Sequence, residues 1–467
     1  MIGVRESCFM VFPPNSDAAI LKDLFNSFKP DSPLEPGDPR YVDFQEVRGD
    51  EDILTELGGY ILKEEDNTYQ LYSGHRGSGK STELKRLAAY LERQGCVVVY
   101  FAAATEDAGD LSFQDTQYQD ILLSCTRQLL EKLQDDVDYS PIWHWLEARW
   151  ETLKELALTD VSLNQINIQV AIPLLSKITA AVRTEPNKRD EIRKLVEANT
   201  ESLVKALNAF IDNAKQQLKS GNNRIVIIAD NLDRIAQIEE PDKMTNLEEI
   251  FINRSELMRS LNCHMVYTAP ISLLYSRSAS NLQDIYGKPQ ILPMVMVQNR
   301  DGEAVDEGIQ QLRLAMERRV MEQVDGLSLV PDVFEAEAVV VLLCLSCGGH
   351  LRDLMHIIRN AINRTSELPI RMKQVKRAIA DFRPAYLDAV LEHEWDLLFQ
   401  VHQNKTRLND LDGLYRALLG RRCILEYRFF DEVEEDVVRW YDVHPLIRGS
   451  KPFRERWAVF SKGDSEG

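Results

Sequence analysis

The sequence predicts an α/β protein built on a five-stranded parallel sheet with helices on both faces. A short strand that leads into a glycine-rich loop and a helix, at residues 68–93, supports this prediction, as does the uninterrupted apolar run at 225–229. Strands of a parallel sheet are covered on both faces, so they read as continuous apolar runs rather than alternating patterns. We expect strands, alternating with helices, at about 68–73, 96–102, 224–230, 263–269 and 290–297.

Composition limits the classes of protein to consider. The 467 residues are 44% hydrophobic, which is enough for about two or three domains. The formal charge of −19 argues against a surface devoted to nucleic acid, because neutralising phosphates requires a local excess of Lys and Arg. The start of the chain has no secretory pattern and no apolar run is long enough to cross a bilayer, so we expect a cytoplasmic protein without membrane contact.

The glycine-rich loop at residues 74–81 reads Gly-His-Arg-Gly-Ser-Gly-Lys-Ser and satisfies the pattern G-x-x-x-x-G-K-[ST]. Such glycines let successive backbone N–H groups converge on a phosphate, at a helix start whose dipole adds positive charge. Lys80 would reach the β- and γ-phosphates, and the Ser81 hydroxyl would bind Mg²⁺. The pattern predicts ATP and Mg²⁺ as cofactors. The predicted nucleotide-binding residues are Gly74, Gly77, Ser78, Gly79, Lys80, Ser81 and Thr82.

An acidic partner for the metal is expected at the carboxyl end of a buried strand. The apolar run at 225–229 ends at Asp230, which we take as the second Mg²⁺ ligand beside Ser81. Many hydrolases follow this aspartate with a glutamate that polarises the attacking water. Here the next residue is Asn231, whose amide cannot accept a proton as a carboxylate can. Asp233 is the nearby carboxylate that could substitute for the glutamate.

The loop GHRGSGKST and the strand IIADNLDRI resemble the ATPase core of the AAA+ and STAND group of P-loop proteins, in particular its origin-recognition-like and KAP-like prokaryotic branches. The resemblance covers residues 40–380. It implies a P-loop NTPase core with a helical lid, and it implies that Arg48 and Gly49 touch the adenine.

The same resemblance implies roles for residues outside the two motifs. Thr268 ends the next strand, where this group places a residue that contacts the γ-phosphate or the water. Arg352 lies near the start of a lid helix and would contact the nucleotide. Arg254, with Arg259 as its competitor, would be the arginine finger that completes a neighbouring subunit's site.

The chain is expected to divide into four segments. These are a proline-rich, extended N-terminal arm, the ATPase core, the helical lid and a winged-helix-like α+β domain, at residues 1–47, 48–300, 301–383 and 384–467. The connection from the second strand to the third is too long for one crossover, so we expect an insertion at about 135–200.

The insertion has its own pattern. Residues 141–156 predict a helix, residues 162–174 alternate like a strand, and residues 188–219 predict one long charged helix. It is either an ordinary helical embellishment or a surface for a partner. Exposed tryptophans would favour a partner, and the candidates are Trp143, Trp145 and Trp150.

The C-terminal segment predicts helices at 388–405 and 411–421 and then a hairpin of strands at 423–429 and 437–447, which is the order of a winged helix. Winged helices usually read DNA, but residues 384–460 hold 11 basic against 14 acidic residues. The tip of the wing is the most acidic stretch of the chain, and its carboxylates would repel phosphates. They are Asp431, Glu432, Glu434, Glu435 and Asp436.

We therefore favour a protein-binding or self-packing wing. The basic helix at 371–383 is the patch that could still meet nucleic acid, although a solvated helix face explains it equally. Cys344 and Cys347 lie in a very apolar helix and have no second pair, so buried thiols are expected rather than a metal site.

Two functions fit these features. In the first, an ATPase hydrolyses ATP at the interfaces of a homo-oligomer, with Arg254 supplied in trans. In the second, bound nucleotide locks the lid through Arg352 and slow hydrolysis resets the switch. Asn231 favours the switch, with a protein effector on another chain. The family resemblance implies a prokaryotic defence or regulatory system. The alternative is a DNA-binding, origin-recognition-like ATPase that uses the winged helix.

Overall fold

The computed structural model describes residues 17–103, 109–133, 137–157, 168–217, 223–238, 245–324, 326–408, 413–431 and 433–463. The chain forms two compact units, each discontinuous in sequence. The sheet unit joins Glu51–Arg76 and Lys80–Leu292, and the C-terminal unit joins Met1–Asp50, Gly77–Gly79 and Pro293–Gly467. The predicted limits at residues 47, 300 and 383 describe a finer division and stay predictions.

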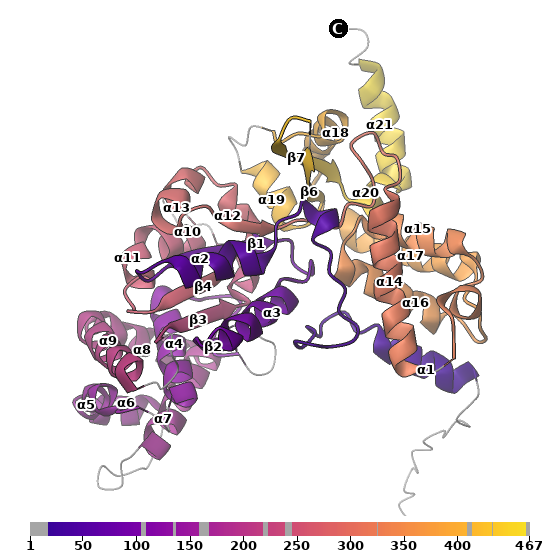
Figure 1. The fold of residues 1–467 in the computed structure, drawn as a ribbon. Helices are drawn as coiled ribbons and strands as arrows, with labels where there is room; N and C mark the ends of the chain where they lie inside the picture. The colour runs from indigo at the N-terminus through magenta and orange to yellow at the C-terminus, as the bar shows by residue number, and fades with distance from the viewer. Residues whose placement is uncertain are drawn as a thin grey trace, which may run out of the picture. The chain divides into compact units, whose positions relative to one another are not determined.

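The sheet unit contains five parallel strands in the order β2-β3-β4-β1-β5 (Figure 1). The predicted α/β fold class is confirmed. The strands are β1 (Tyr69–Gly74), β2 (Val97–Ala102), β3 (Ile225–Asp230), β4 (His264–Ala269) and β5 (Gln290–Leu292). β5 is shorter than the predicted 290–297, because the backbone after it bonds elsewhere: Met294 and Met296 donate to Glu426 and Val47 within the C-terminal unit.

The strand order determines which residues meet at the carboxyl edge of the sheet. β4 lies between β1 and β3, with Tyr72 of β1 paired to Thr268 and Ala229 of β3 paired to Tyr267. The loop that follows β1 and the end of β3 therefore flank the end of β4. In open α/β sheets, ligands bind outside this edge.

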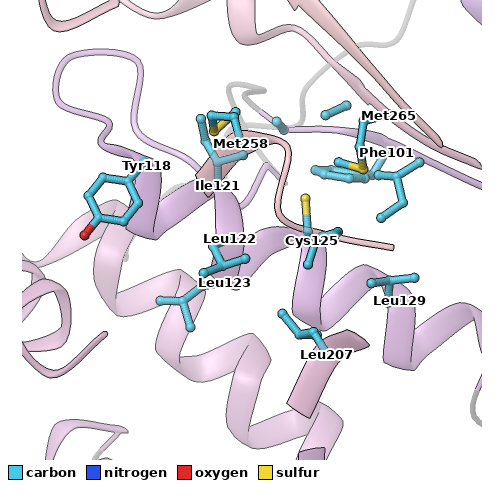
Figure 2. Close-up of a cluster of buried hydrophobic side chains, with 14 of the residues drawn as sticks. Phe101, Tyr118, Ile121, Leu122, Leu123, Cys125, Leu129, Leu207, Met258 and Met265 are labelled. Carbon is cyan, nitrogen blue, oxygen red and sulfur yellow. The ribbon is translucent and has the colours of Figure 1, made fainter. Parts of the chain in front are cut away.

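Two apolar clusters hold helices on the two faces of the sheet. On one face, strand residues such as Ile227 and Met265 pack with helix α4 (Tyr118–Leu133), as Figure 2 shows for Ile121, Leu129 and Met265. On the other face, Ile228 and its neighbours pack with helix α3 (Lys80–Arg93). Consecutive residues of β3 thus face opposite layers, which explains its uninterrupted apolar sequence.

The remaining helices of the sheet unit surround this core or form the insertion. They are α2 (Gly59–Lys63), α5 (Ser140–Glu147), α6 (Trp150–Ala157), α7 (Ile168–Thr184), α8 (Pro186–Glu197), α9 (Thr200–Gln217), α10 (Asn246–Glu248), α11 (Ser255–Met258), α12 (Ile271–Leu274) and α13 (Ala279–Tyr286).

The insertion corrects two sequence predictions. The strand expected at 162–174 is wrong from Ile168 on, where helix α7 begins, while 162–167 lies outside the described residues. Buried residues of α7 recur at helical spacing, so the local alternation misled the prediction; they are Ala171, Leu174, Leu175, Ile178, Ala181 and Val182. The single helix expected at 188–219 is two helices, because the chain turns at 198–199 and Asn199 accepts the first backbone hydrogen bond of α9.

The tryptophans of the insertion give little support to an exposed aromatic surface. Trp145 is buried, and its indole N–H donates to the Ser202 hydroxyl. Trp143 is partly buried against the same core. The side chain of Trp150 lies outside the described residues.

The C-terminal unit is mostly helical. Its elements are α1 (Asp17–Ser27), α14 (Asp306–Gln323), α15 (Glu337–Cys347), α16 (Leu351–Asn363), α17 (Met372–Leu387), α18 (Trp395–Asn404), α19 (Leu414–Gly420), β6 (Ile424–Asp431), β7 (Asp436–Val443), α20 (Pro445–Arg448) and α21 (Lys451–Gly463). The predicted extended arm contains helix α1, which packs on α14 and α16. From residue 28 to residue 45, the arm has neither helix nor strand.

Two helices followed by an antiparallel hairpin, α18, α19 and β6–β7, match the predicted winged-helix-like order. The first helix begins at Trp395 instead of residue 388. The second strand ends at Val443 instead of residue 447, because Pro445 cannot donate to a ladder and begins α20. Helix α21 had no counterpart among the predictions.

The cysteines within the described ranges are free and buried, as predicted for Cys344 and Cys347. No helix in those ranges has the length and apolar character needed to cross a membrane.

Candidate functional site

The glycine-rich loop connects β1 to α3, which begins at Lys80 as the motif requires. Gly74, Gly77 and Gly79 adopt positive φ angles of 145°, 91° and 110°. A Cβ at Gly74 would lie 2.6 Å from the carbonyl oxygen of Leu292, so a larger residue would clash as well as being strained. The loop conformation therefore depends on these glycines.

The ammonium of Lys80 is buried and fully engaged within the sheet unit. It donates to the carbonyl oxygens of Gly74 and His75, at 2.9 and 3.0 Å, and lies 2.9 Å from Oδ2 of Asp233. Both charged side chains of this ion pair are about 5% exposed. The structure thus brings together the lysine that we predicted to bind phosphate and the carboxylate that we predicted as a base.

Arg76 of the glycine-rich loop holds the backbone at Asp233 in place. Its guanidinium donates twice to the carbonyl oxygen of Asp233, at 3.0 and 2.8 Å. The glycine-rich loop therefore holds Asp233 through both its side chain and its main chain.

Asp230 is 1% exposed at the end of β3. Its Oδ1 accepts from the N–H of Asn231 at 2.6 Å, its Oδ2 accepts from the Tyr100 hydroxyl at 2.8 Å, and its carboxylate is hydrogen-bonded to Ser81. Burial raises the pKa of Asp230, while the hydrogen bonds from Ser81 and Tyr100 act in the opposite direction. The two predicted metal ligands are therefore in direct contact.

Thr268 lies at the end of β4, between the strands that carry the two motifs, and its hydroxyl bonds to the protein backbone. Its Oγ1 accepts from the N–H of Leu232 at 2.8 Å, and the hydroxyl is fully buried. This bond holds the turn in which Asn231 adopts a left-handed backbone with φ of 67°. Contact of Thr268 with a γ-phosphate or water stays a prediction.

Two predicted residues contact the middle of the glycine-rich loop within the C-terminal unit. Arg48 is buried and donates to the carbonyl oxygen of Ser78 at 2.7 Å. The N–H of Arg352 donates to the carbonyl oxygen of Gly77 at 3.2 Å, while its side chain pairs with Asp31 at 3.1 Å. A Cβ on Gly77 would lie 2.7 Å from that of Arg352, so the two backbones approach closely.

Gly49 has a φ of 85° and lies against Arg428 of β6. The predicted contacts of Arg48 and Gly49 with adenine, and of Arg352 with the nucleotide, stay predictions. The structure shows where Arg48, Gly49 and Arg352 lie within the C-terminal unit.

The arginine-finger candidates lie elsewhere in the sheet unit. Arg254 is 44% exposed, pairs with Glu249 at 2.8 Å and lies over the ring of Tyr118. Arg259 donates to the carbonyl oxygen of Ile285 at 3.1 Å. An exposed pair of this kind contributes little to stability, so Arg254 could exchange its partner at low cost.

The side chains present suit a magnesium–nucleotide complex. Ser81 and Asp230 offer oxygen ligands, and Mg²⁺ is usually held by one or two such groups together with phosphate oxygens. No cluster of three His, Cys, Asp or Glu side chains within the described ranges forms a metal site by itself. In such sites Mg²⁺ takes its remaining ligands from phosphate oxygens and water.

A strand, a glycine-rich loop, a helix that begins at lysine and a strand-end aspartate together define a P-loop nucleotide-binding domain. Sequence comparison finds that residues 71–251 match the KAP family P-loop domain. The predicted resemblance to KAP-like P-loop ATPases is confirmed. No protein with a curated description matches the chain.

Solved structures of archaeal ATPases are similar at low identity. The Orc1 protein of Aeropyrum pernix in complex with DNA is 14% identical, with a TM-score of 0.38 over 92% of this chain and 97% of that one. The Walker-type ATPase PABY2304 of Pyrococcus abyssi is 12% identical, with a TM-score of 0.42 over 91% and 99%. Cdc6p of Pyrobaculum aerophilum is 12% identical, with a TM-score of 0.38 over 94% and 97%.

Sequence reasoning missed Arg76 and Tyr100, which position the two carboxylates. Arg76 occupies a variable position of the loop motif, so the pattern assigns it no role. Tyr100 stands in an apolar strand, where an aromatic residue is expected for packing alone.

Proposed function

We propose that this chain is an ATP-binding switch that hydrolyses ATP slowly and acts on a protein partner. The observation that carries this proposal is the buried Lys80–Asp233 ion pair, directly beside the contact between Ser81 and Asp230. Phosphate binding and water activation draw on the same pair of side chains, so one step is coupled to the other.

Lys80 has three N–H donors, and all three have acceptors in the structure. A phosphate that binds Lys80 must therefore replace at least one of them. Asp233 is the only anionic acceptor of the three, and a phosphate is the competitor that matches it in charge. ATP binding would release the Asp233 carboxylate from Lys80.

Released in this way, Asp233 becomes available to accept a proton from an attacking water, which Asn231 cannot do. Arg76 would keep the backbone of Asp233 in place while its side chain moves. Mg²⁺, held by Ser81 and Asp230, would supply charge neutralisation at the phosphates. Because the base is first sequestered, slow turnover is expected, which suits a switch better than a fast motor.

The partner is proposed to be a protein. The tip of the β6–β7 hairpin exposes carboxylates at Glu434, Glu435 and Asp436 together with Val433, which is 88% exposed. Such a tip repels phosphates and offers an apolar contact. A homo-oligomer in which the exposed Arg254 completes a neighbour's site is part of the same proposal.

Calorimetry with ATP and Mg²⁺ tests the proposal. We expect binding by the wild type and a loss of affinity of roughly tenfold or more in Lys80→Ala, because a charge-assisted contact is lost. Arg93→Ala, an exposed change at the other end of α3, is the control and should bind as wild type does. Absence of binding in the wild type, or equal binding by Lys80→Ala, would contradict the proposal.

A further inference from the structure

Tyr100 contacts the candidate metal ligand from a strand that neither motif includes. It lies on β2, in register with Ile228 of β3, and its hydroxyl donates to Oδ2 of Asp230 at 2.8 Å. β2 and β3 are hydrogen-bonded neighbours at the edge of the sheet (Figure 1). The contact therefore links the outermost strand to the carboxyl edge where the nucleotide is proposed to bind.

The Tyr100 bond completes the hydrogen bonding of a carboxylate that has almost no solvent contact. Asp230 is 1% exposed, and its Oδ1 already accepts from the N–H of Asn231 at 2.6 Å. With Oδ2 bonded to Tyr100, both oxygens have a fixed donor, so the plane of the carboxylate is set. A carboxylate has about four acceptor sites, which leaves places for a metal or its water.

The ring of Tyr100 is itself held in place. The Lys85 ammonium lies 5.9 Å from the ring centroid, and Lys85 belongs to the same helix as Lys80 and Ser81. Helix α3, which carries the predicted metal ligand Ser81, thus also contacts Tyr100.

We propose that Tyr100 is a positioning residue that orients Asp230 toward Mg²⁺ beside Ser81. The inference rests on the proposed function, because it concerns the metal of the same site. Its consequence is specific: Tyr100 determines how well the nucleotide complex uses Mg²⁺, whereas the affinity for metal-free ATP is set by the glycine-rich loop and Lys80.

Tyr100→Phe removes the hydroxyl and keeps the ring. We expect the Mg²⁺ concentration at half-saturation of ATP binding to rise roughly tenfold, the size expected when one hydrogen bond to a charged group is lost. ATP binding in EDTA should not change. Both quantities are measured with a fluorescent ATP analogue, titrated with MgCl₂ or with nucleotide alone.

Tyr69→Phe is the matched control, since it removes a tyrosine hydroxyl from the same sheet. That hydroxyl donates to the carbonyl oxygen of Leu261 at 2.9 Å, and Tyr69 opens β1 at the edge opposite Asp230. The control should keep the wild-type dependence on Mg²⁺. Thermal unfolding of each variant identifies any loss of folding. Tyr100→Leu, which also removes the hydroxyl and places another apolar residue in the strand, provides a second test.

The outcomes separate the inference from the proposed function. If the wild type binds no ATP, the proposed function itself fails. If the wild type binds ATP equally with and without Mg²⁺, the proposed function stands and the positioning role of Tyr100 is overturned. If the wild type depends on Mg²⁺ and Tyr100→Phe and Tyr100→Leu depend on it equally, the positioning role of Tyr100 is overturned. An equal shift in Tyr69→Phe would also overturn it, because the effect would then be general to the sheet.

Discussion

At the scale of single residues, the Lys80 ammonium has an acceptor for each of its N–H donors: two carbonyl oxygens of the loop and the Asp233 carboxylate. Both side chains of this ion pair are about 95% buried. Leaving one of the two charges buried without its partner costs free energy. Its partners are therefore expected to exchange together. This makes Asp233 both a competitor of phosphate and a candidate base.

Asp233→Asn separates these two roles. The neutral amide still fills the space but competes less with phosphate, so ATP affinity should stay equal or rise. Phosphate release should fall by roughly a hundredfold, the typical contribution of a general base. Calorimetry and steady-state phosphate release measure the two effects, with the exposed Asp284→Asn as control. Unchanged phosphate release would remove Asp233 from the mechanism.

At the scale of secondary-structure elements, ion pairs of Arg193 connect the insertion to α4 and to the segment that precedes it. Arg193 of α8 binds Asp120 of α4 at 2.5 Å, and their side chains are 6% and 1% exposed. Arg193 also binds Asp115 at 3.0 Å. The segment before α4 also contacts the chain that follows β3 at the carboxyl edge of the sheet. There the N–H of Ala236 donates to the carbonyl oxygen of Phe113.

Asp120→Ala should lower the free energy of unfolding of this region by about 3–5 kcal/mol, because it leaves the buried Arg193 without its closest carboxylate. Urea unfolding measures the change. Glu92→Ala breaks an exposed pair with Lys132 at 3.4 Å and should change the free energy by less than about 0.5 kcal/mol. Equal effects of the two substitutions would show that the buried Arg193–Asp120 pair does not stabilise this region.

His264, at the start of β4, gives the sheet a dependence on pH. Its Nδ1 accepts from the N–H of Thr68 at 3.1 Å, which requires that nitrogen to be unprotonated. Burial, with the positive charges of Arg224 and Lys215, lowers the pKa of His264 to about 4 from its ordinary 6.5. Between these values the unfolded chain binds more protons than the folded one, so stability is complete above pH 6.5 and falls as the pH drops toward 4.

His264→Gln should flatten this dependence. The loss between pH 6.5 and 4 is up to about 3 kcal/mol for such a pKa difference, and the variant should lack that part of it. Thermal midpoints across the pH range test the prediction, with the exposed His144→Gln as the control. A wild-type profile retained in His264→Gln would show that another group is responsible.

Local patterns predicted the elements whose signal lies within a few consecutive residues. β3 was found because a strand covered on both faces is uniformly apolar, and β1 was found because it leads directly into the glycine-rich loop. Helix α7 was missed because a short window around Ile168 alternates by chance, and the helical spacing emerges only further along. The chain turns at Asn199, whose carbonyl oxygen accepts the first backbone hydrogen bond of α9, and a pattern of charges does not reveal this division of α8 from α9.

The site was predictable to the same extent. Lys80, Ser81 and Asp230 belong to motifs whose spacing encodes their chemistry. The contact of Tyr100 with Asp230 joins residues 130 positions apart and depends on which strands are neighbours. The pairing of Lys80 with Asp233 likewise depends on strand order, since β4 lies between the two motifs.

At the scale of the whole molecule, the charge of −19 and the acidic hairpin tip favour a protein partner over DNA. Asp431 shapes this tip by accepting from the N–H groups of Val433 and Glu434. The basic alternative is the exposed side of α17, which carries Lys373 and Lys376.

We expect duplex DNA to bind no more tightly than non-specific complexes do, roughly 10⁻⁴–10⁻⁶ M at physiological salt. Fluorescence anisotropy over a range of salt concentrations measures this. Glu434→Lys with Glu435→Lys should strengthen binding by removing repulsion. Tight, salt-sensitive binding by the wild type that is lost in Lys373→Glu with Lys376→Glu would instead support the DNA-binding alternative.

The most direct test of the central claim is hydrogen exchange of the full chain with and without ATP and Mg²⁺. If ATP binds at the P-loop, amides in peptides covering residues 74–82 should exchange more slowly in its presence, and peptides covering 230–236 should change as Asp233 leaves Lys80. Lys80→Ala should show neither change. Unchanged exchange at 74–82 in the wild type, or protection confined to other segments, would contradict the claim that this loop is the nucleotide site.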